Sequence, residues 1–263
     1  MKAAYDVIVV GAGPAGSTAA RRAAEGGLDV LLIEKRQEIG APVRCAEAIG
    51  VELSRPFIEP DECWIDARIN YYAIRNSRGE RVKLPPAEPT LVVNRKVFDV
   101  ELALKAARAG AVIQAGVAAV GLAHDGTRVS GVRMEMGRRQ MEIRARLVIA
   151  ADGTESQVAR WAGLRTTPPP GDYYSAFEYY LAGVGGKIEA DTCEYHLDAT
   201  LAPGGYLWIF PKGEDSANVG LVVTADRAQG TSLQEKLAAN GRERATKKYD
   251  WQAVLAAMRP IYE

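Results

Sequence analysis

The turn Gly11-Ala-Gly13-Pro-Ala-Gly16 constrains the fold more than any other feature of the sequence. It follows an apolar stretch at residues 5–10, typical of a buried strand, and it precedes a helical pattern. At this spacing Gly11 permits a tight turn, Gly13 lets a pyrophosphate approach the backbone, and Gly16 lets the helix pack on the sheet. The free N–H groups and partial positive charge of the helix N-terminus favour phosphate binding. The sequence therefore predicts an α/β unit that binds a dinucleotide.

Glu34 completes this pattern. It lies near the end of the stretch LDVLLIEK (residues 28–35), which we predict to be the second strand of the unit. A carboxylate at this point can accept a hydrogen bond from a ribose hydroxyl, and a charged hydrogen bond contributes roughly 1.5–3 kcal/mol. The pattern by itself fits both FAD and NAD.

A second motif lies about 140 residues further on, where a strand runs into Ala151-Asp152-Gly153 and then into a short helix starting at Thr154 or Ser156. It resembles the Asp-Gly motif of the flavoprotein hydroxylase and geranylgeranyl reductase superfamily, which lies near the ribityl and pyrophosphate region of the flavin. The residues alone leave open an ordinary turn in which Asp152 caps the helix. Together the two motifs favour FAD.

Two further segments narrow the resemblance. APVRCAEAIG (residues 41–50) and GGYLWIFPKG (residues 204–213) are similar to segments of the geranylgeranyl reductase family, over residues 1–224 in all. This family includes archaeal-type enzymes that saturate the isoprenoid chains of ether lipids. The resemblance implies an α/β fold, in which a Rossmann-like FAD-binding domain is entwined with a mainly antiparallel β-sheet substrate domain. It also implies reduction of isoprenoid C=C bonds in a lipid, with FAD as cofactor.

The pattern of elements gives the expected domain bounds. The FAD-binding domain is predicted at 1–63 and 94–163, the substrate domain at 64–93 and 172–224, and a helical tail at 225–263 is left unassigned. Within them we predict an irregular stretch at 36–63, short strands at 64–94, a helix at 95–109, three strands across 111–153, a proline-rich linker at 163–172, and strands at 173–181, 188–197, 205–211 and 217–224.

The resemblance carries a set of cofactor contacts. By this resemblance Arg95 would contact the flavin, although the sequence around it also fits a solvated arginine at the start of a helix. Ala48 stands where the family usually has glycine. The expected cofactor-binding residues are Gly11, Gly13, Ala15, Gly16, Glu34, Lys35, Arg44, Cys45, Ala46, Ala48, Arg95, Ala119, Asp152 and Gly153.

Three aromatic residues alternate in the last of these segments. In a strand, Tyr206, Trp208 and Phe210 share one face. If protonation leads in the reduction of an isolated C=C bond, the substituted carbon becomes cation-like, and aromatic faces stabilise such charge by about 0.5–2 kcal/mol each. They would also bury a hydrocarbon chain, at roughly 25 cal/mol per Å². We predict that they bind the substrate, with an ordinary sheet core as the alternative.

The candidate catalytic residues are Cys45, Glu47 and Tyr206. The thiol of Cys45 is a proton donor in one interpretation and a small packing group in the other. Glu47 is the competing acid.

One family feature is missing. A third flavin motif, of Gly-Asp-Ala type, should follow the aromatic strand, but the only Gly-Asp pair, Gly171-Asp172, lies in the proline-rich linker. We therefore expect a C-terminally truncated family member. A flavin monooxygenase or halogenase on the same fold, and a catalytically inactive flavin-binding remnant, remain alternatives. An NAD-binding dehydrogenase fits the Asp-Gly motif poorly.

Composition excludes other classes. Lys plus Arg and Asp plus Glu both number 33, so no net charge attracts nucleic acid. Three widely spaced cysteines predict neither disulfides nor a metal site, and no apolar run reaches the ~18 residues of a membrane span. We expect a cytoplasmic protein, and a peripheral membrane contact with a prenylated lipid stays compatible with the sequence. The reductant, NAD(P)H or ferredoxin, and the oligomeric state are left open.

Overall fold

The computed structural model describes residues 1–154 and 156–224, and these divide into two compact units. The first unit consists of Met1–Val43 and Arg95–Thr167, and the second, among the described residues, of Arg44–Asn94 and 168–224. The predicted tail at 225–263 lies outside the described residues.

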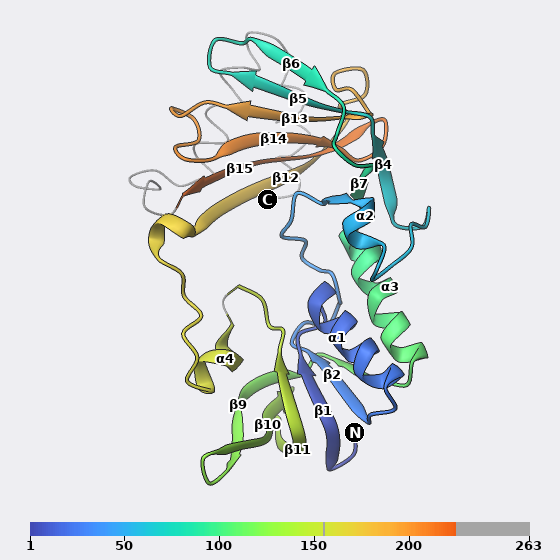
Figure 1. Cartoon of the computed structure of the whole chain (residues 1–263), viewed down its shortest axis with the longest axis vertical. Helices are drawn as coiled ribbons and strands as arrows, with labels where there is room; N and C mark the ends of the chain where they lie inside the picture. Colours follow the sequence, from blue (N-terminus) through green and yellow to red (C-terminus); the bar gives the residue numbers. More distant parts are fainter. Residues whose placement is uncertain (155, 225–263) are drawn as a thin grey trace. The chain divides into compact units, whose positions relative to one another are not determined.

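The first unit is built around a six-stranded sheet with the order β8-β2-β1-β11-β10-β9 (Figure 1). Strands β8, β2, β1 and β11 run parallel, whereas β11, β10 and β9 form an antiparallel meander. The elements are β1 (Ala4–Val10), α1 (Pro14–Glu25), β2 (Val30–Glu34), α3 (Arg95–Arg108), β8 (Val112–Ala115), β9 (Ala118–Asp125), β10 (Arg128–Met136), β11 (Arg139–Ala150) and α4 (Gln157–Trp161).

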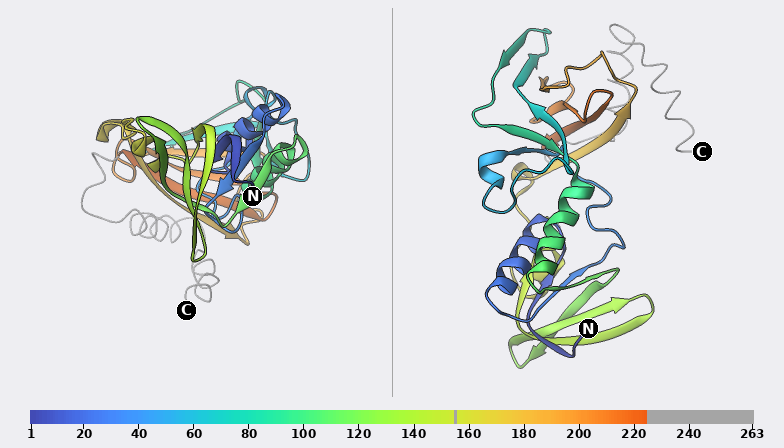
Figure 2. Two further views of the ribbon diagram at one scale, coloured as in Figure 1. Left: turned by 90° about the horizontal axis from the view of Figure 1, so that it is seen from below. Right: turned by 90° about the vertical axis from the view of Figure 1, so that its right-hand side faces the viewer.

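Alternate residues of β1 serve two separate cores of this unit. Val7 and Val9 pack with alanines of α1 and α3, which lie side by side on that face of the sheet (Figure 2). Ile8 and Val10 face the opposite way and pack with residues of β9, β10 and β11. Because both faces are covered, β1 is apolar throughout its centre, as the sequence indicated.

The second unit contains two sheets. The larger has the order β12-β15-β14-β13-β5-β6 and the smaller the order β3-β7-β4. All pairs in them are antiparallel except β13 with β5. The elements are β3 (Ala48–Gly50), α2 (Val51–Ser54), β4 (Ile65–Ile69), β5 (Tyr71–Asn76), β6 (Arg81–Leu84), β7 (Thr90–Val93), η1 (Pro170–Asp172), β12 (Tyr174–Ala182), β13 (Thr192–Leu197), β14 (Tyr206–Pro211) and β15 (Ser216–Thr224).

One face of the larger sheet carries the aromatic residues. Trp208 and Phe210 on β14 pack with Cys193 on β13 and with Ile69 and Val92 of the smaller sheet. The outcome is a sheet-on-sheet core in which large aromatic side chains occupy the centre.

Two predicted stretches differ in the structure. Residues 111–126 form two strands, β8 and β9, because Gly116 adopts φ +72° and interrupts the ladder, so that β8 and β9 lie at opposite edges of their sheet. Residues 36–63, predicted irregular, contain β3 and α2. β3 pairs with β7, so the chain enters the second unit at Arg44 rather than at residue 64.

The other face of the larger sheet carries a charged cluster on β13, β5 and β6. Arg75 Nε and His196 Nε2 each lie 2.7 Å from Glu194 Oε1, and Arg81 Nε lies 3.5 Å from Oε2 of the same carboxylate. Burial by itself would raise the pKa of Glu194, but the hydrogen bonds from His196 and Arg75 outweigh burial and lower this pKa to about 2.

This cluster predicts an acid-sensitive contribution to stability. The folded-state pKa of Glu194 lies below the ordinary value of 4.5, so its ionised form stabilises the fold above about pH 4.5 and loses that effect as the pH falls towards about 2. We expect Glu194→Gln to lower the free energy of unfolding at neutral pH by about 3 kcal/mol, and by much less at about pH 2. Urea denaturation at both pH values measures this, and an equal loss at both would contradict it.

Candidate functional site

Each unit contains one candidate functional site. The candidate site of the first unit is the glycine turn between β1 and α1. Gly11 has φ +101°, and a Cβ there would lie 2.3 Å from the carbonyl oxygen of Ala151. A Cβ on Gly16 would lie 1.8 Å from the carbonyl oxygen of Gly11. Both glycines are therefore required by close backbone approach, and the turn lies directly beside the Asp-Gly motif that follows β11.

Gly13 differs from these two glycines. It is the N-cap of α1, and a Cβ there would meet no atom of residues 1–154 or 156–224 within 4 Å. In the described part of the chain no side chain caps the helix. Its first turn contains no acidic residue, and Ala15 in that turn is exposed. The positive end of the helix therefore has no side-chain cap among the described residues, and there is open space beside Gly13.

Glu34 lies beside this turn. Its Oε2 accepts a hydrogen bond from Ala12 N–H at 3.0 Å, and its Oε1 accepts one from Arg36 N–H at 2.9 Å. The carboxylate is thus fixed next to the glycines at the end of β2. Lys35, the next residue, is exposed.

These features fit an adenine dinucleotide such as FAD. The uncapped helix end and the open space at Gly13 can accept a pyrophosphate, and the fixed Glu34 carboxylate can accept from a ribose hydroxyl. Among the described residues, no neighbouring atom requires glycine at position 13, unlike positions 11 and 16. A bound ligand is therefore a reason for glycine at this position.

Asp152 caps the helix that follows it. Its Oδ2 accepts hydrogen bonds from Gln157 N–H at 2.7 Å and Val158 N–H at 3.0 Å, and its Oδ1 accepts one from the Ser156 hydroxyl at 2.7 Å. The capping role that the residues left open is therefore present. Gly153, with φ +88°, completes the turn, and Ser156, one of the two predicted helix starts, is the N-cap of α4.

The remaining predicted contacts in this unit are Arg95 and Ala119. Arg95 begins α3, and its guanidinium donates to both carboxylate oxygens of Asp99 at 2.7 and 2.8 Å. Ala119 lies on β9 and packs against the apolar core under β1. A flavin contact by either residue stays a prediction.

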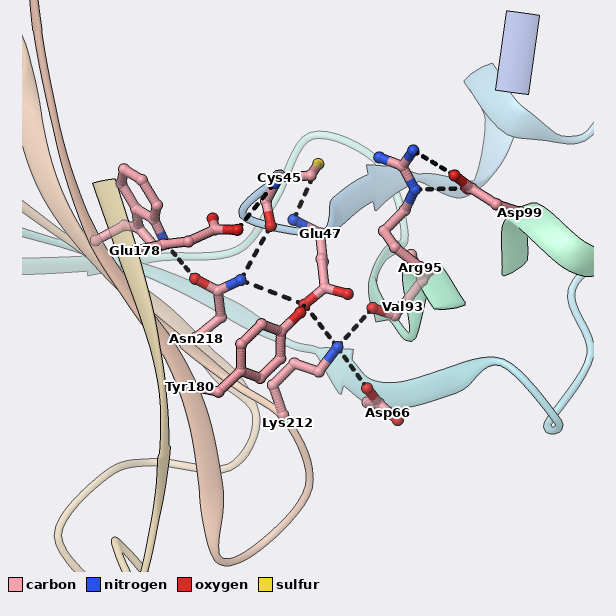
Figure 3. A network of polar contacts seen from close by, with 11 residues as sticks. Cys45, Glu47, Asp66, Val93, Arg95, Asp99, Glu178, Tyr180, Lys212 and Asn218 are labelled. Carbon is pink, nitrogen blue, oxygen red and sulfur yellow. Dashed lines mark hydrogen bonds and ion pairs between the residues drawn. The ribbon is translucent and has the colours of Figure 1, made fainter. Parts of the chain in front are cut away.

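The second site is a buried polar network around Glu47 (Figure 3). Glu47 has no exposed surface, and its φ of +70° is unusual for a residue with a side chain. Its Oε2 accepts hydrogen bonds from the Tyr180 hydroxyl, from Lys212 Nζ at 2.7 Å and from Asn218 Nδ2 at 3.2 Å. Figure 3 shows all three side chains pointing toward this carboxylate. A backbone held in this sparsely populated region costs of order 1–3 kcal/mol, and the three donors offset that cost.

Lys212 carries the positive charge of the network. Its ammonium also lies 2.6 Å from Asp66 Oδ2 and donates to the carbonyl oxygen of Val93 at 2.8 Å. Only 7% of its side chain is exposed. Lys212 thus joins Glu47 to strands β4 and β7.

Cys45 is held by backbone contacts as well as by its thiol. Its carbonyl accepts from Asn218 Nδ2 at 3.0 Å, and its N–H donates to Glu178 Oε1 at 3.1 Å. Cys45 Sγ accepts the N–H of Glu47 at 3.3 Å. The oxygen of Asn218 accepts from Trp208 Nε1 at 2.9 Å, so one amide links the cysteine segment to the aromatic strand.

The predicted aromatic face exists, but its members differ in exposure. Trp208 and Phe210 are each 3% exposed, whereas Tyr206 is 36% exposed. Tyr195 joins them, with its ring centroid 5.6 Å from that of Tyr206 and 5.2 Å from that of Phe210, both edge-on. Ala46 and Ala48 pack against the same cluster, and Arg44 is exposed.

Five network residues escaped the sequence-based predictions: Asp66, Glu178, Tyr180, Lys212 and Asn218. The available signals were weak. Lys212 directly follows the aromatic strand, and Asn218 is a polar residue within an apolar strand. Glu178 and Tyr180 alternate on β12 like ordinary surface residues.

Comparison with known proteins decides the family. A family model described as FAD dependent oxidoreductase matches residues 6–169. The chain belongs to this family. A second model, the geranylgeranyl reductase catalytic domain, matches residues 172–258 of this FAD-dependent oxidoreductase, including part of the tail that the sequence alone left unassigned. The predicted resemblance is confirmed.

Individual relatives agree with this assignment. A digeranylgeranylglycerophospholipid reductase of Methanocella arvoryzae is 47% identical over 88% of this chain and 59% of its own length. A crystal structure of a geranylgeranyl bacteriochlorophyll reductase-like protein from Thermoplasma acidophilum has a TM-score of 0.85 and 36% identity, over 91% of this chain and 62% of that one. This chain therefore spans about three fifths of their length. The predicted α/β fold class is confirmed.

A flavin-dependent brominase variant shares the fold alone. It has a TM-score of 0.76 at 19% identity, over 94% of this chain and 64% of that one. Within residues 1–154 and 156–224, no three His, Cys, Asp or Glu side chains gather into a potential metal site. In the same residues no helix is long and apolar enough to cross a membrane.

The glycine turn yields a paired prediction. We expect Gly13→Ala to weaken FAD binding tenfold or more, which corresponds to about 1.4 kcal/mol per tenfold. The free energy of unfolding should fall by about 1 kcal/mol or less, because the added methyl group obstructs only the ligand. Gly16→Ala should instead destabilise the fold, because its methyl would meet backbone. FAD titration and thermal unfolding of both variants separate the effects, and unchanged FAD affinity in Gly13→Ala would contradict the assignment.

The buried ion pair yields a second prediction. Lys212→Met leaves the Glu47 carboxylate buried without its cation, so we expect a loss of about 3–5 kcal/mol in the free energy of unfolding. Adding Glu47→Gln should recover part of that loss. Urea denaturation measures both, with exposed Lys187→Met as the matched control. Equal effects of Lys212→Met and Lys187→Met would show that the pair contributes nothing.

Proposed function

We propose that this FAD-dependent oxidoreductase reduces isoprenoid C=C bonds of the geranylgeranyl type in a prenylated lipid. The observation that carries the proposal is the match of the geranylgeranyl reductase catalytic domain to residues 172–258, the region that holds the aromatic strand β14. The printed name of the 47% identical relative supports a digeranylgeranylglycerophospholipid as substrate.

In this proposal some residues bind the cofactor and others contact the substrate. The first turn of α1 and Glu34 hold the dinucleotide, and FAD, once bound and reduced, supplies the hydride. Tyr206 is the exposed member of the aromatic face, so it is the one able to contact a prenyl chain, with Trp208 and Phe210 packed behind it. Arg44, Cys45, Ala46 and Ala48 contact the flavin in this proposal, as the family resemblance implies.

The predicted catalytic residues receive different roles. Cys45 is half-buried and remains a candidate to act near the substrate. Glu47 is fully buried and bound by three donors, so it acts through its neighbours rather than on a substrate directly.

Three finer points belong to the same proposal. The reductant of the flavin is NAD(P)H or ferredoxin, and a lipid substrate brings the protein to a membrane surface in the cytoplasm. A halogenase or monooxygenase activity shares the fold but is less well supported, because the brominase is only 19% identical.

The decisive experiment is anaerobic reduction of a lipid. The purified chain is loaded with FAD, reduced with dithionite and mixed with vesicles that contain digeranylgeranylglycerophospholipid. We expect the lipid mass to rise by two hydrogens for each C=C bond reduced. Fully reduced flavin with no change in lipid mass would overturn the proposal, and oxygen-dependent NAD(P)H consumption instead would favour the monooxygenase alternative.

The aromatic face gives a variant for the same assay. We expect Tyr206→Ala to slow lipid reduction by about two- to thirty-fold, the equivalent of 0.5–2 kcal/mol, without changing the FAD content. Tyr71→Ala is the matched control, because Tyr71 is similarly exposed but lies on the opposite face of the sheet from its neighbour Tyr72, which packs in the aromatic cluster. If the two variants reduce the lipid equally fast, Tyr206 does not contact the substrate.

A further inference from the structure

The carboxylates of the buried network are not equivalent. Glu47 and Asp66 both bind the ammonium of Lys212, at 2.7 and 2.6 Å. Glu178, among the described residues, forms no salt bridge, and its Oε1 accepts the Cys45 N–H at 3.1 Å. One acidic side chain of the network therefore lacks a cation in direct contact.

Strand register places this side chain on the aromatic face of the sheet. Glu178 on β12 pairs with Gly220 on β15, and Gly220 pairs with Trp208 on β14. A Cβ on Gly220 would lie 2.0 Å from the Trp208 ring, so the indole covers this glycine. Glu178 is thus the next residue of the row beyond Trp208, at the border between aromatic and polar side chains, and it is only half-buried.

Saturating an isolated C=C bond needs one hydride and one proton. We propose that Glu178 is the residue that donates the proton in the reduction of the prenyl chain, an inference that rests on the proposed function. Its O–H bond would break as a C–H bond forms at one alkene carbon, and the other carbon would receive the hydride that FAD, when bound and reduced, would supply. The carboxylate left behind regains a proton from water.

The surroundings of Glu178 suit this role. Burial, and then the negative charge of Glu47, raise the pKa of Glu178. The Cys45 N–H, the side-chain amide of Asn218 and the Lys212 ammonium oppose the rise. The Tyr180 hydroxyl also belongs to this network. A glutamic acid with a raised pKa keeps its proton closer to neutral pH, where it can act as a general acid.

The neighbouring side chains of Glu47, Tyr180 and Cys45 are less suited to donate this proton. Glu47 has no exposed surface. The Tyr180 hydroxyl already donates its hydrogen bond to the Glu47 carboxylate, and burial and this hydrogen bond raise its pKa. The thiol of Cys45 accepts the Glu47 N–H, and a Cys45→Ser variant tests its part separately.

The test compares Glu178→Gln with Glu214→Gln, an exposed loop residue, in the anaerobic lipid assay. The glutamine oxygen can still accept the Cys45 N–H but has no acidic proton. We expect Glu178→Gln to lower kcat by about 100-fold or more with FAD content and KM unchanged, and Glu178→Asp to recover part of the rate. Wild-type kcat should fall as the pH rises through the pKa of Glu178, and this limb should vanish in Glu178→Gln.

A titration gives an independent readout. In protein labelled with ¹³C-glutamate, the carboxyl signal absent from Glu178→Gln should titrate above the ordinary glutamate value of 4.5. A pKa at or below that value, or a kcat for Glu178→Gln equal to that of Glu214→Gln, overturns the role of Glu178. A wild-type chain that binds FAD but reduces no prenyl lipid would instead contradict the proposed function itself.

Discussion

The buried pair of Glu47 and Lys212 organises the second unit. Moving two charges out of water costs several kcal/mol per ion, and only close partners offset that cost. Here the carboxylate has three donors, and the ammonium contacts Glu47, Asp66 and a backbone carbonyl. These partners come from strands of both sheets, so satisfying one charge fixes the register of several elements. The strained backbone at Glu47 is a consequence of the same arrangement.

The buried polar network and the aromatic cluster are joined by hydrogen bonds of one residue, Asn218. The amide of Asn218 is fully buried, and it accepts from Trp208 while donating to the carbonyl of Cys45 and to Glu47. An apolar side chain in its place would leave buried polar groups without partners. The aromatic cluster and the buried polar network therefore share a single hydrogen-bonding residue.

Sequence could predict what local spacing encodes. The glycine turn, the carboxylate at Glu34 and the shared face of Tyr206, Trp208 and Phe210 all follow from periods within one or two elements. The partners of Glu47 could not be predicted in this way, because sheet pairing brings together residues more than 130 positions apart. Nor does any sequence period reveal that two of the three aromatic residues are buried.

The same limit explains the missed elements. Gly116, which has a positive φ, divides residues 111–126 into two strands that lie at opposite edges of a sheet. The amino-acid composition of this stretch does not reveal the break. The short β3 is stabilised by its pairing with β7 rather than by its own pattern.

The parallel pairing of β1 with β11 has a consequence for biosynthesis. The second edge of β1 stays uncovered until residues 144–150 have left the ribosome, after the whole intervening chain has been made. During that interval an apolar strand is exposed to neighbouring nascent chains, and closing so long a loop is slow. Fragments that end before β11 would therefore aggregate rather than fold, so a shortened version of the first unit has to retain that distant strand.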